Sequence, residues 1–150
     1  MPEKEYEKIE LFFDLTGEIV NFVGKGLNEK QDWVGYNITL GFKRDGYIIG
    51  GVVFHDIRPT IDVWLTIYCI DKRWCNRRIL RAIFDIAFDF LKCRRISVRV
   101  DALNIKSQKL VEGLGFRKEG VLRMFEENGN DGIIYSMLKN ECIWRTIKNE

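Results

Sequence analysis

Residues 61–100 read IDVWLTIYCI DKRWCNRRIL RAIFDIAFDF LKCRRISVRV, and the spacing of their apolar side chains changes twice. Residues 61–70 alternate polar with apolar side chains, which predicts a strand with two unlike faces. Residues 77–92 place apolar side chains three and four positions apart, which is typical of an amphipathic helix. Residues 96–100 alternate again. The segment therefore predicts two parallel strands, adjacent or nearly so, that a helix joins by a right-handed crossover.

Upstream of this unit the sequence predicts a strand, a helix and a hairpin. Residues 7–13 are an apolar-rich run that favours a strand, and residues 16–23 have the spacing of a helix that Gly24 and Gly26 would end. Two runs rich in β-branched and aromatic residues follow, at 36–43 and 47–55. Asp45-Gly46 lies between them, and this dipeptide is a strong indication of a β-hairpin.

Downstream of the unit the pattern predicts a short helix, two strands and a last helix. The helix covers residues 107–114 and ends at Gly115, the strands cover 116–124 and 133–138, and the last helix covers 140–148. Helices that interleave with strands place the chain in the α/β class. We expect one domain over residues 1–150, built on a mixed sheet of about six to seven strands with helices on both faces.

Composition excludes several classes of protein. Apolar residues make up 46% of the 150 residues and the formal net charge is +2, so the chain is neither disordered nor strongly basic. No apolar run approaches the roughly 20 residues of a membrane span, and the charged start lacks the apolar core of a signal peptide. None of the four cysteines lies in a C-x-x-C pair, so no metal site is predicted. We therefore expect a cytoplasmic protein whose thiols stay reduced.

Basic residues gather where the strand at 61–70 meets the helix at 77–92. The cluster consists of Lys72, Arg73, Arg77, Arg78 and Arg81. A helix start also offers free backbone N–H groups, so the position suits a polyanion such as a nucleotide, a phosphorylated cofactor or nucleic acid. A basic helix start that is simply solvated explains the charges equally well.

The most specific motif begins at Asn104. An Asn after a strand is followed by a small residue three positions later, a short helix and a Gly-Phe turn; the matching residues are Asn104, Ser107, Gly115, Phe116, Glu119, Gly120 and Arg123. In this pattern the sequence resembles the GNAT acetyltransferase superfamily. Residues 115–123 resemble the branch that contains ribosomal-protein N-terminal acetyltransferases and short phage-encoded relatives. The expected strand order also agrees with that family.

The resemblance implies acetyl-CoA as co-substrate and a sheet that splays centrally between the strands at 61–70 and 96–100. The thioester would lie in that gap, the pantetheine arm would contact the end of the first strand, and the pyrophosphate would bind at the next turn. The implied cofactor-binding residues are Cys69, Ile70, Arg73, Trp74, Cys75, Asn76, Arg77, Arg78, Asn104 and Ser107.

Two departures from the family pattern stand out. The phosphate loop of the family carries glycines that let the backbone close on the pyrophosphate, but this chain has none between Gly51 and Gly113. Many members also carry, on the short helix, a Tyr that protonates the departing thiolate. The matching residue here is Val111.

The sequence offers candidates for the general base and for the general acid, of which His55 and Tyr68 are the leading ones. His55 ends a strand next to Asp56, and the ordinary pKa of an imidazole suits removal of a proton from an amine near neutral pH. A strand-end histidine held by structural hydrogen bonds is the alternative interpretation. Tyr68 and Tyr135 are candidates for the missing acid, although a strand Tyr more often packs with its hydroxyl satisfied. Asp62 and Glu126 are alternative bases that would act through water, although strand-end carboxylates are more often solvated.

Three functional hypotheses follow. The first is an acetyl-CoA-dependent N-acetyltransferase, in which a primary amine of a protein N-terminus, a lysine or a small molecule attacks the thioester directly. The second is a catalytically degenerate member that binds an acyl-CoA or a protein partner. The third, a nucleic-acid-binding module, is disfavoured by the low net charge and by the lack of a nucleic-acid-binding motif. A homodimer is compatible with each hypothesis.

Overall fold

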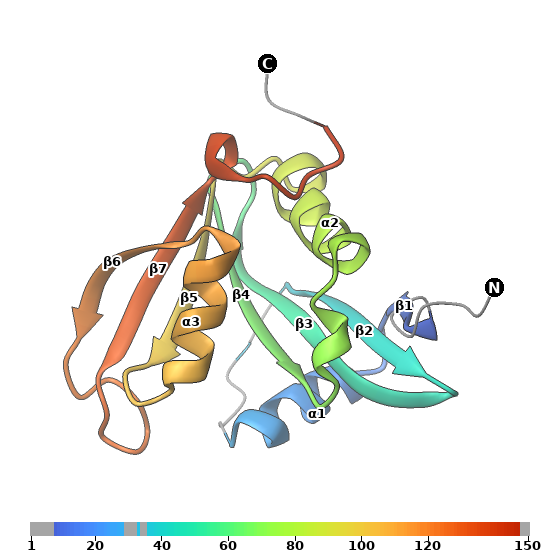
Figure 1. Ribbon diagram of the computed structural model, residues 1–150, viewed down its shortest axis with the longest axis horizontal. Coiled ribbons are helices and arrows are strands. Elements are labelled where there is room, and N and C mark those ends of the chain that lie inside the picture. The colour runs from blue at the N-terminus through green and yellow to red at the C-terminus, as the bar shows by residue number, and fades with distance from the viewer. Residues whose placement is uncertain (1–7, 29–32, 34–35, 148–150) are drawn as a thin grey trace.

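The computed structural model describes residues 8–28, 33 and 36–147, and its strands and α-helices follow the predicted order up to the last strand (Figure 1). The strands are β1 (Glu10–Phe13), β2 (Ile38–Arg44), β3 (Tyr47–Arg58), β4 (Asp62–Cys69), β5 (Arg95–Asp101), β6 (Arg117–Leu122) and β7 (Gly132–Leu138). The helices are α1 (Glu18–Leu27), α2 (Arg77–Asp85) and α3 (Ile105–Leu114). A π-helical segment, η3 (Ile86–Phe90), continues α2, so the predicted helix at 77–92 is confirmed with a change of geometry near its end.

The described strands form one sheet of order β1-β2-β3-β4-β5-β7-β6. Among these pairs only β4 and β5 are parallel, as the strand-helix-strand pattern predicted. Their pairing is short: it runs from Asp62–Arg95 to Trp64–Ser97 and then ends. Figure 1 shows the two strands starting together and diverging toward their carboxyl ends. The mixed, centrally splayed sheet is thus confirmed.

The β2–β3 hairpin follows from local turn chemistry. Asp45 and Gly46 have φ angles of 52° and 80°, and left-handed backbone at both central residues is what a two-residue type I′ turn requires. β3 continues to Arg58, three residues beyond the predicted end, and its register against β4 shifts between His55 and Arg58. That bulge turns the end of β3.

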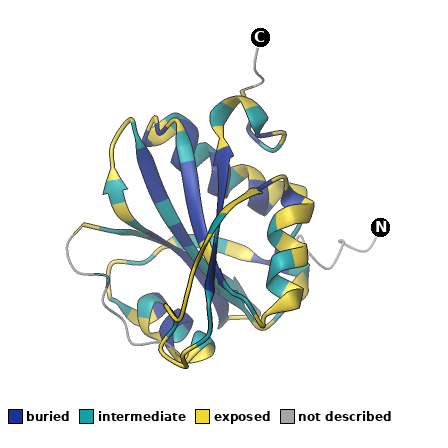
Figure 2. Cartoon of the chain, turned by 90° about the vertical axis from the view of Figure 1, so that its left-hand side faces the viewer, coloured by how far each residue is buried: buried dark blue, intermediate teal, exposed yellow. Residues whose placement is uncertain are grey.

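The sheet carries a core on each face (Figure 2). The larger core lies under α2 and α3 and includes Val52, Phe54, Val63, Phe84 and Tyr135. The smaller core lies under α1 and includes Ile19, Val23 and Val53. Successive residues of β3 alternate between the two cores, as the period of a strand requires. Helices on both faces of the sheet are confirmed.

The predicted end of α1 is wrong. The helix runs through Gly24 and Gly26 to Leu27, and Asn28 caps it with a left-handed φ of 55°. A tertiary contact explains the glycine: a Cβ on Gly26 would lie 2.1 Å from Cε1 of Tyr68. Gly26 therefore lets the helix approach β4 closely instead of ending it.

The predicted last helix is also wrong. After β7 the chain makes a short 3-10 turn, η4 (Lys139–Glu141), and then runs without a helix to the last described residue, 147; residue 148 lies outside the described range. The side chains of this segment are used in long-range contacts instead. The Trp144 indole N–H donates to the Leu114 carbonyl at 2.9 Å, and the buried Arg145 makes two hydrogen bonds to Asp89.

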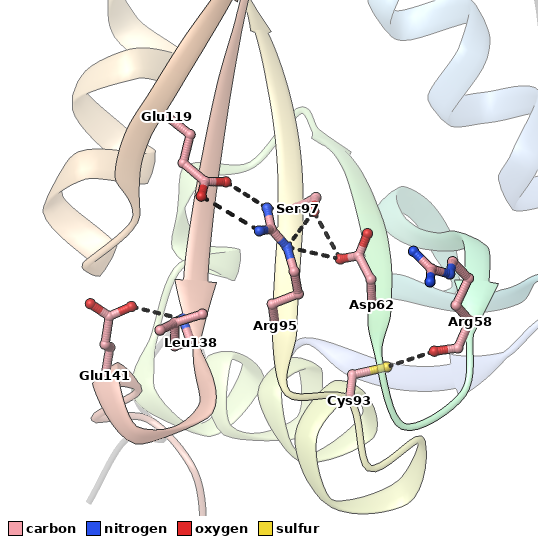
Figure 3. Close-up of polar contacts among 8 residues, drawn as sticks. All are labelled: Arg58, Asp62, Cys93, Arg95, Ser97, Glu119, Leu138 and Glu141. Carbon is pink, nitrogen blue, oxygen red and sulfur yellow. Dashed lines mark hydrogen bonds and ion pairs between the residues drawn. The ribbon is translucent and has the colours of Figure 1, made fainter.

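A polar cluster joins β4 and β5 where they are still paired (Figure 3). The Ser97 hydroxyl donates to Oδ1 of the buried Asp62 at 2.8 Å, and Arg95 lies 3.5 Å from the same oxygen. Arg95 also reaches the Glu119 carboxylate on β6 at 2.5 Å. The cluster therefore links residues of β4, β5 and β6 at the closed end of the splay.

Candidate functional site

A cleft of about 1120 Å³ opens where β4 and β5 separate. Residues from both faces of the sheet line it: Leu80 of α2, with Asn104 and Ser107 at the start of α3, on one face, and His55 and Trp64 on the other. A passage through the sheet is possible here because the β4–β5 pairing stops at Trp64–Ser97. Two reactants could therefore meet in this cleft from opposite sides.

The α3 side of the cleft is shaped by a helix cap. The Asn104 side chain accepts a hydrogen bond from the Ser107 backbone N–H at 3.1 Å, which fixes the first turn of α3. Ser107 and Val111 then face the cleft from the same helix. The structure thus brings two predicted cofactor residues, Asn104 and Ser107, to the cleft, together with the valine that replaces the family's tyrosine.

The loop before α2 is held by its own side chains. Asp71 caps the short 3-10 turn η2 (Lys72–Trp74) and accepts hydrogen bonds from Arg44 and Arg73, at 3.1 and 2.7 Å. Trp74 is buried and stacks on Phe42, with ring centroids 6.0 Å apart. The predicted cofactor residues Arg73 and Trp74 therefore rigidify the loop, and Trp74 does not face the cleft.

The first turn of α2 is basic and exposed. The Asn76 side chain caps the helix by accepting the Ile79 N–H at 3.1 Å. Arg77 is exposed and stacks over the Trp144 ring, while Arg78 donates to the Ile9 carbonyl. Leu80, one turn later, lines the cleft, whereas the predicted cofactor residues Asn76, Arg77 and Arg78 do not. The cationic helix start is thus within one helical turn of a residue that lines the cleft.

The remaining predicted cofactor residues lie nearby but outside the cleft lining. Cys69 is half-buried at the end of β4, where its thiol donates to the Asp71 carbonyl, and Cys75 is half-buried just before α2. Ile70 is exposed and lines a separate shallow depression with Arg73 and Arg44, beside the β2–β3 turn.

Burial raises the pKa of all four thiols, and for Cys69 the value reaches about 11. The thiolate is the reactive form, so at pH 8 Cys69 should alkylate about 100-fold more slowly than an exposed cysteine. Iodoacetamide labelling with peptide mass analysis, native against urea-unfolded, measures this directly. Modification of Cys69 at equal rates in the two states would contradict the prediction.

The opposite side of the cleft holds a hydrogen-bonded histidine. His55 Nδ1 lies 2.6 Å from Asp56 Oδ2, and Nε2 lies 2.8 Å from the Thr66 hydroxyl. The Trp33 ring packs on the imidazole at a centroid distance of 5.4 Å. Burial lowers the pKa of His55 below 6.5, although Asp56 acts in the other direction. His55, one of the two predicted catalytic residues, is thus in the cleft.

The loop between β6 and β7 completes this side of the cleft. Glu126 pairs with Arg99 of β5 at 2.8 Å, and the Arg99 guanidinium lies over the Phe125 ring. Glu127 also lines the cleft. Among the described residues, no group of three or more His, Cys, Asp or Glu side chains is placed to hold a metal ion. This side therefore combines aromatic surface with an excess of carboxylates.

The structure does not bring Tyr68 to the cleft. Its ring packs under α1, 6.0 Å from the Phe22 ring, in the smaller core. Tyr135 is also buried elsewhere, and its hydroxyl donates to Glu112 at 3.0 Å. Burial and Glu112 raise the pKa of Tyr135 to about 12. Sequence reasoning missed Thr66 and Arg99, whose roles depend on register between strands.

Comparison with known families agrees with this architecture. The family described as "Acetyltransferase (GNAT) domain" matches residues 7–117, which is most of the chain. The chain belongs to this family. The resemblance of the sequence to the GNAT superfamily is therefore confirmed. No helix in the described part of the chain is long and apolar enough to cross a membrane.

Relatives and solved structures extend the comparison. A curated protein named "Probable N-acetyltransferase YjcK", from Bacillus subtilis (strain 168), is 32% identical over 93 residues, and the chain spans about half its length, 51%. A dodecameric spermidine N-acetyltransferase from Vibrio cholerae has a TM-score of 0.72 at 18% identity, covering 89% of this chain and 95% of that one. The structure of the Vibrio cholerae spermidine N-acetyltransferase in complex with CoA and spermine has a TM-score of 0.71 at 15% identity, and the match covers 90% of this chain and 98% of that one. At such identities these structures show the fold.

Proposed function

We propose that the chain transfers an acetyl group from acetyl-CoA to a primary amine by direct attack of the amine on the thioester. The observation that carries the proposal is the cleft through the sheet, lined from both faces where β4 and β5 diverge. The thioester arm enters between α2 and α3, and the amine approaches from the side of His55. Backbone N–H groups of β4 beyond the paired segment stabilise the oxyanion that forms.

The basic first turn of α2 holds the pyrophosphate in this proposal. A helix start favours anions through its backbone N–H groups, and Lys72 and Arg77 add exposed cations. The fixed loop before α2 takes the place of a glycine-rich one, because Asp71 and Asn76 already set its backbone. In this proposal, side chains supply part of the contact with the pyrophosphate that the backbone of a glycine-rich loop would otherwise make.

The acceptor in this proposal is a cationic primary amine. Asp56, Glu126 and Glu127 outnumber Arg99 on the acceptor side, and Trp33 and Trp64 add aromatic surface. Carboxylates and aromatic faces both attract an ammonium group. Spermine-type small amines fit this description and agree with the ligand of the CoA and spermine complex. Protein N-termini, implied by resemblance to the ribosomal-protein acetyltransferase branch, are the second acceptor class.

Calorimetric titration of acetyl-CoA, with desulfo-CoA and ATP as comparators, tests the cofactor part of the proposal. We expect micromolar binding that Arg77→Ala weakens about tenfold. Arg94→Ala, which removes an exposed arginine just before β5, is the matched control and should leave affinity unchanged. Absence of binding at millimolar acetyl-CoA would overturn the enzyme hypothesis.

Turnover is measured as CoA release against spermidine, spermine and peptides with free N-termini. Acetylation of any of these amines supports the enzyme, and the preferred one identifies the acceptor class. Binding of acetyl-CoA without turnover of any amine would instead favour the catalytically degenerate module, to which Val111 and the glycine-free loop point.

A further inference from the structure

Three side chains form a continuous hydrogen-bonded line beside the cleft. Asp56 contacts Nδ1 of His55, and Nε2 of His55 contacts the hydroxyl of Thr66. All three residues line the cleft on the side away from α3. The line crosses from β3 to β4, because the antiparallel register places His55 opposite Trp64 and Val53 opposite Thr66, on the same face.

The backbone is shaped to make this line. Asp56 has a left-handed φ of 48°, at the bulge where the β3–β4 register shifts. Non-glycine residues rarely adopt this conformation, although Asp tolerates it better than most. The turn brings the Asp56 carboxylate back toward the side chain of the preceding residue. Its 2.6 Å contact with His55 is the result.

Hydrogen-bond chemistry gives the line a direction. A carboxylate only accepts hydrogen bonds, so His55 Nδ1 must donate to Asp56. A neutral imidazole carries one N–H, which leaves Nε2 as an acceptor. The Thr66 hydroxyl therefore donates to Nε2, and the lone pairs of Thr66 Oγ1 remain to accept a hydrogen bond from a group in the cleft.

Position and protonation both suit proton removal. Thr66 lies two residues beyond Trp64, the last β4 residue paired with β5, so its hydroxyl is at the open part of the splay. The charged groups that face the imidazole are Asp56 on β3 and Arg99 on β5. Burial, with a smaller contribution from Arg99, keeps the pKa of His55 below its ordinary value, so the ring is neutral at pH 7.

We propose that Thr66 Oγ1 receives a proton from the acceptor nitrogen, that His55 Nε2 receives the hydroxyl's own proton, and that Asp56 positions the imidazole. The inference rests on the proposed acetyl transfer. One proton of the ammonium first passes through Thr66 to His55 and then to solvent, which frees the nitrogen lone pair that forms the N–C bond. As the C–S bond breaks, a second proton leaves the same nitrogen and ends on the departing thiolate, and the third stays in the amide.

The alternative to a proton relay is a structural role, in which these hydrogen bonds only pair the two ring nitrogens of a histidine at the end of a strand. His55 is the sole histidine of the chain, so long-range ¹H–¹⁵N NMR observes its two ring nitrogens without ambiguity. We expect a protonated Nδ1 and a bare Nε2 at pH 7.5. A protonated Nε2 would make Thr66 the acceptor and overturn the relay. This readout does not depend on turnover.

Kinetics test the same proposal through Thr66→Val. We expect kcat to fall about 100-fold with the KM for acetyl-CoA unchanged, and Thr66→Ser to recover most of the loss. Wild-type kcat/KM should fall with decreasing pH through the His55 pKa measured by NMR, because a protonated ring accepts no proton. In the Thr66→Val variant, kcat/KM should not show this fall with decreasing pH. Thr39→Val, which removes a hydroxyl from β2 outside the cleft, is the matched control.

Two further outcomes separate this proposal from the proposed function. An unchanged kcat in Thr66→Val, or a serine variant as slow as the valine variant, would overturn the relay while acetyl transfer stands. Failure of the wild-type chain to bind acetyl-CoA or to acetylate any amine would overturn both.

Discussion

Replacing Arg95 with alanine should lower the free energy of unfolding by about 3 kcal/mol. The side chain is the bridge of the polar cluster at the closed end of the splay: it lies 3.5 Å from Asp62 and contacts Glu119. Asp62 is only 8% exposed. Without the guanidinium its carboxylate keeps only the Ser97 hydroxyl from this cluster, and a buried charge with so little compensation is costly.

Urea unfolding at pH 7 measures this loss. Arg94→Ala is the matched control, because Arg94 is the exposed neighbour, and should change stability by less than about 0.5 kcal/mol. A double-mutant cycle with Asp62→Ala should show coupling of about 1 kcal/mol or more. Purely additive effects, or an Arg95→Ala loss no larger than that of the control, would contradict the assigned role.

The cluster also explains why the sheet can splay in one direction. Three residue pairs hold β4 to β5, from Asp62–Arg95 to Trp64–Ser97, and the polar side chains that reinforce them lie at these pairs. Beyond them the two strands are free to separate and expose backbone groups to a ligand. The stable pairing of β4 and β5 at one end of the splay therefore permits the two strands to separate at the other.

Local patterns predicted most of the fold. The change of period within residues 61–100 and the Asp45-Gly46 turn depend on neighbours in sequence, so they predicted β4, α2, β5 and the hairpin. The errors arose where a distant contact decides the outcome. α1 continues through Gly26 because the Tyr68 ring packs there, and the tail is not helical because Trp144 and Arg145 bind elsewhere.

The candidate site was predicted only in part, because some of its residues depend on local sequence and others on contacts between distant segments. The motif at Asn104 depends on a local cap and predicted the α3 side of the cleft. The role of Thr66 could not be predicted, because its contact with His55 depends on the β3–β4 register. Basic residues before α2 suggested anion contacts, but Arg73 turns to Asp71 and Trp74 enters the core. Composition alone does not indicate which charged side chains already have partners.

Replacing Ser107 with tryptophan should abolish acetyl-CoA binding while leaving the fold intact. Ser107 is half-buried on the first turn of α3 and lines the cleft, so an indole at this position would occupy the space beside α3 through which the acyl-CoA arm is proposed to pass. The Asn104 cap binds the backbone N–H of residue 107, so it survives the change of side chain. We expect the Kd to rise from micromolar to weaker than millimolar, a loss of more than about 4 kcal/mol.

Calorimetry checks this expectation alongside two companion variants. Lys109→Trp adds the same ring to an exposed position on the same helix and should bind acetyl-CoA like the wild type. Ser107→Ala removes only a hydroxyl and should cost no more than about 1 kcal/mol of affinity. If Ser107→Trp binds acetyl-CoA within tenfold of the wild type, the acyl-CoA arm does not pass along α3.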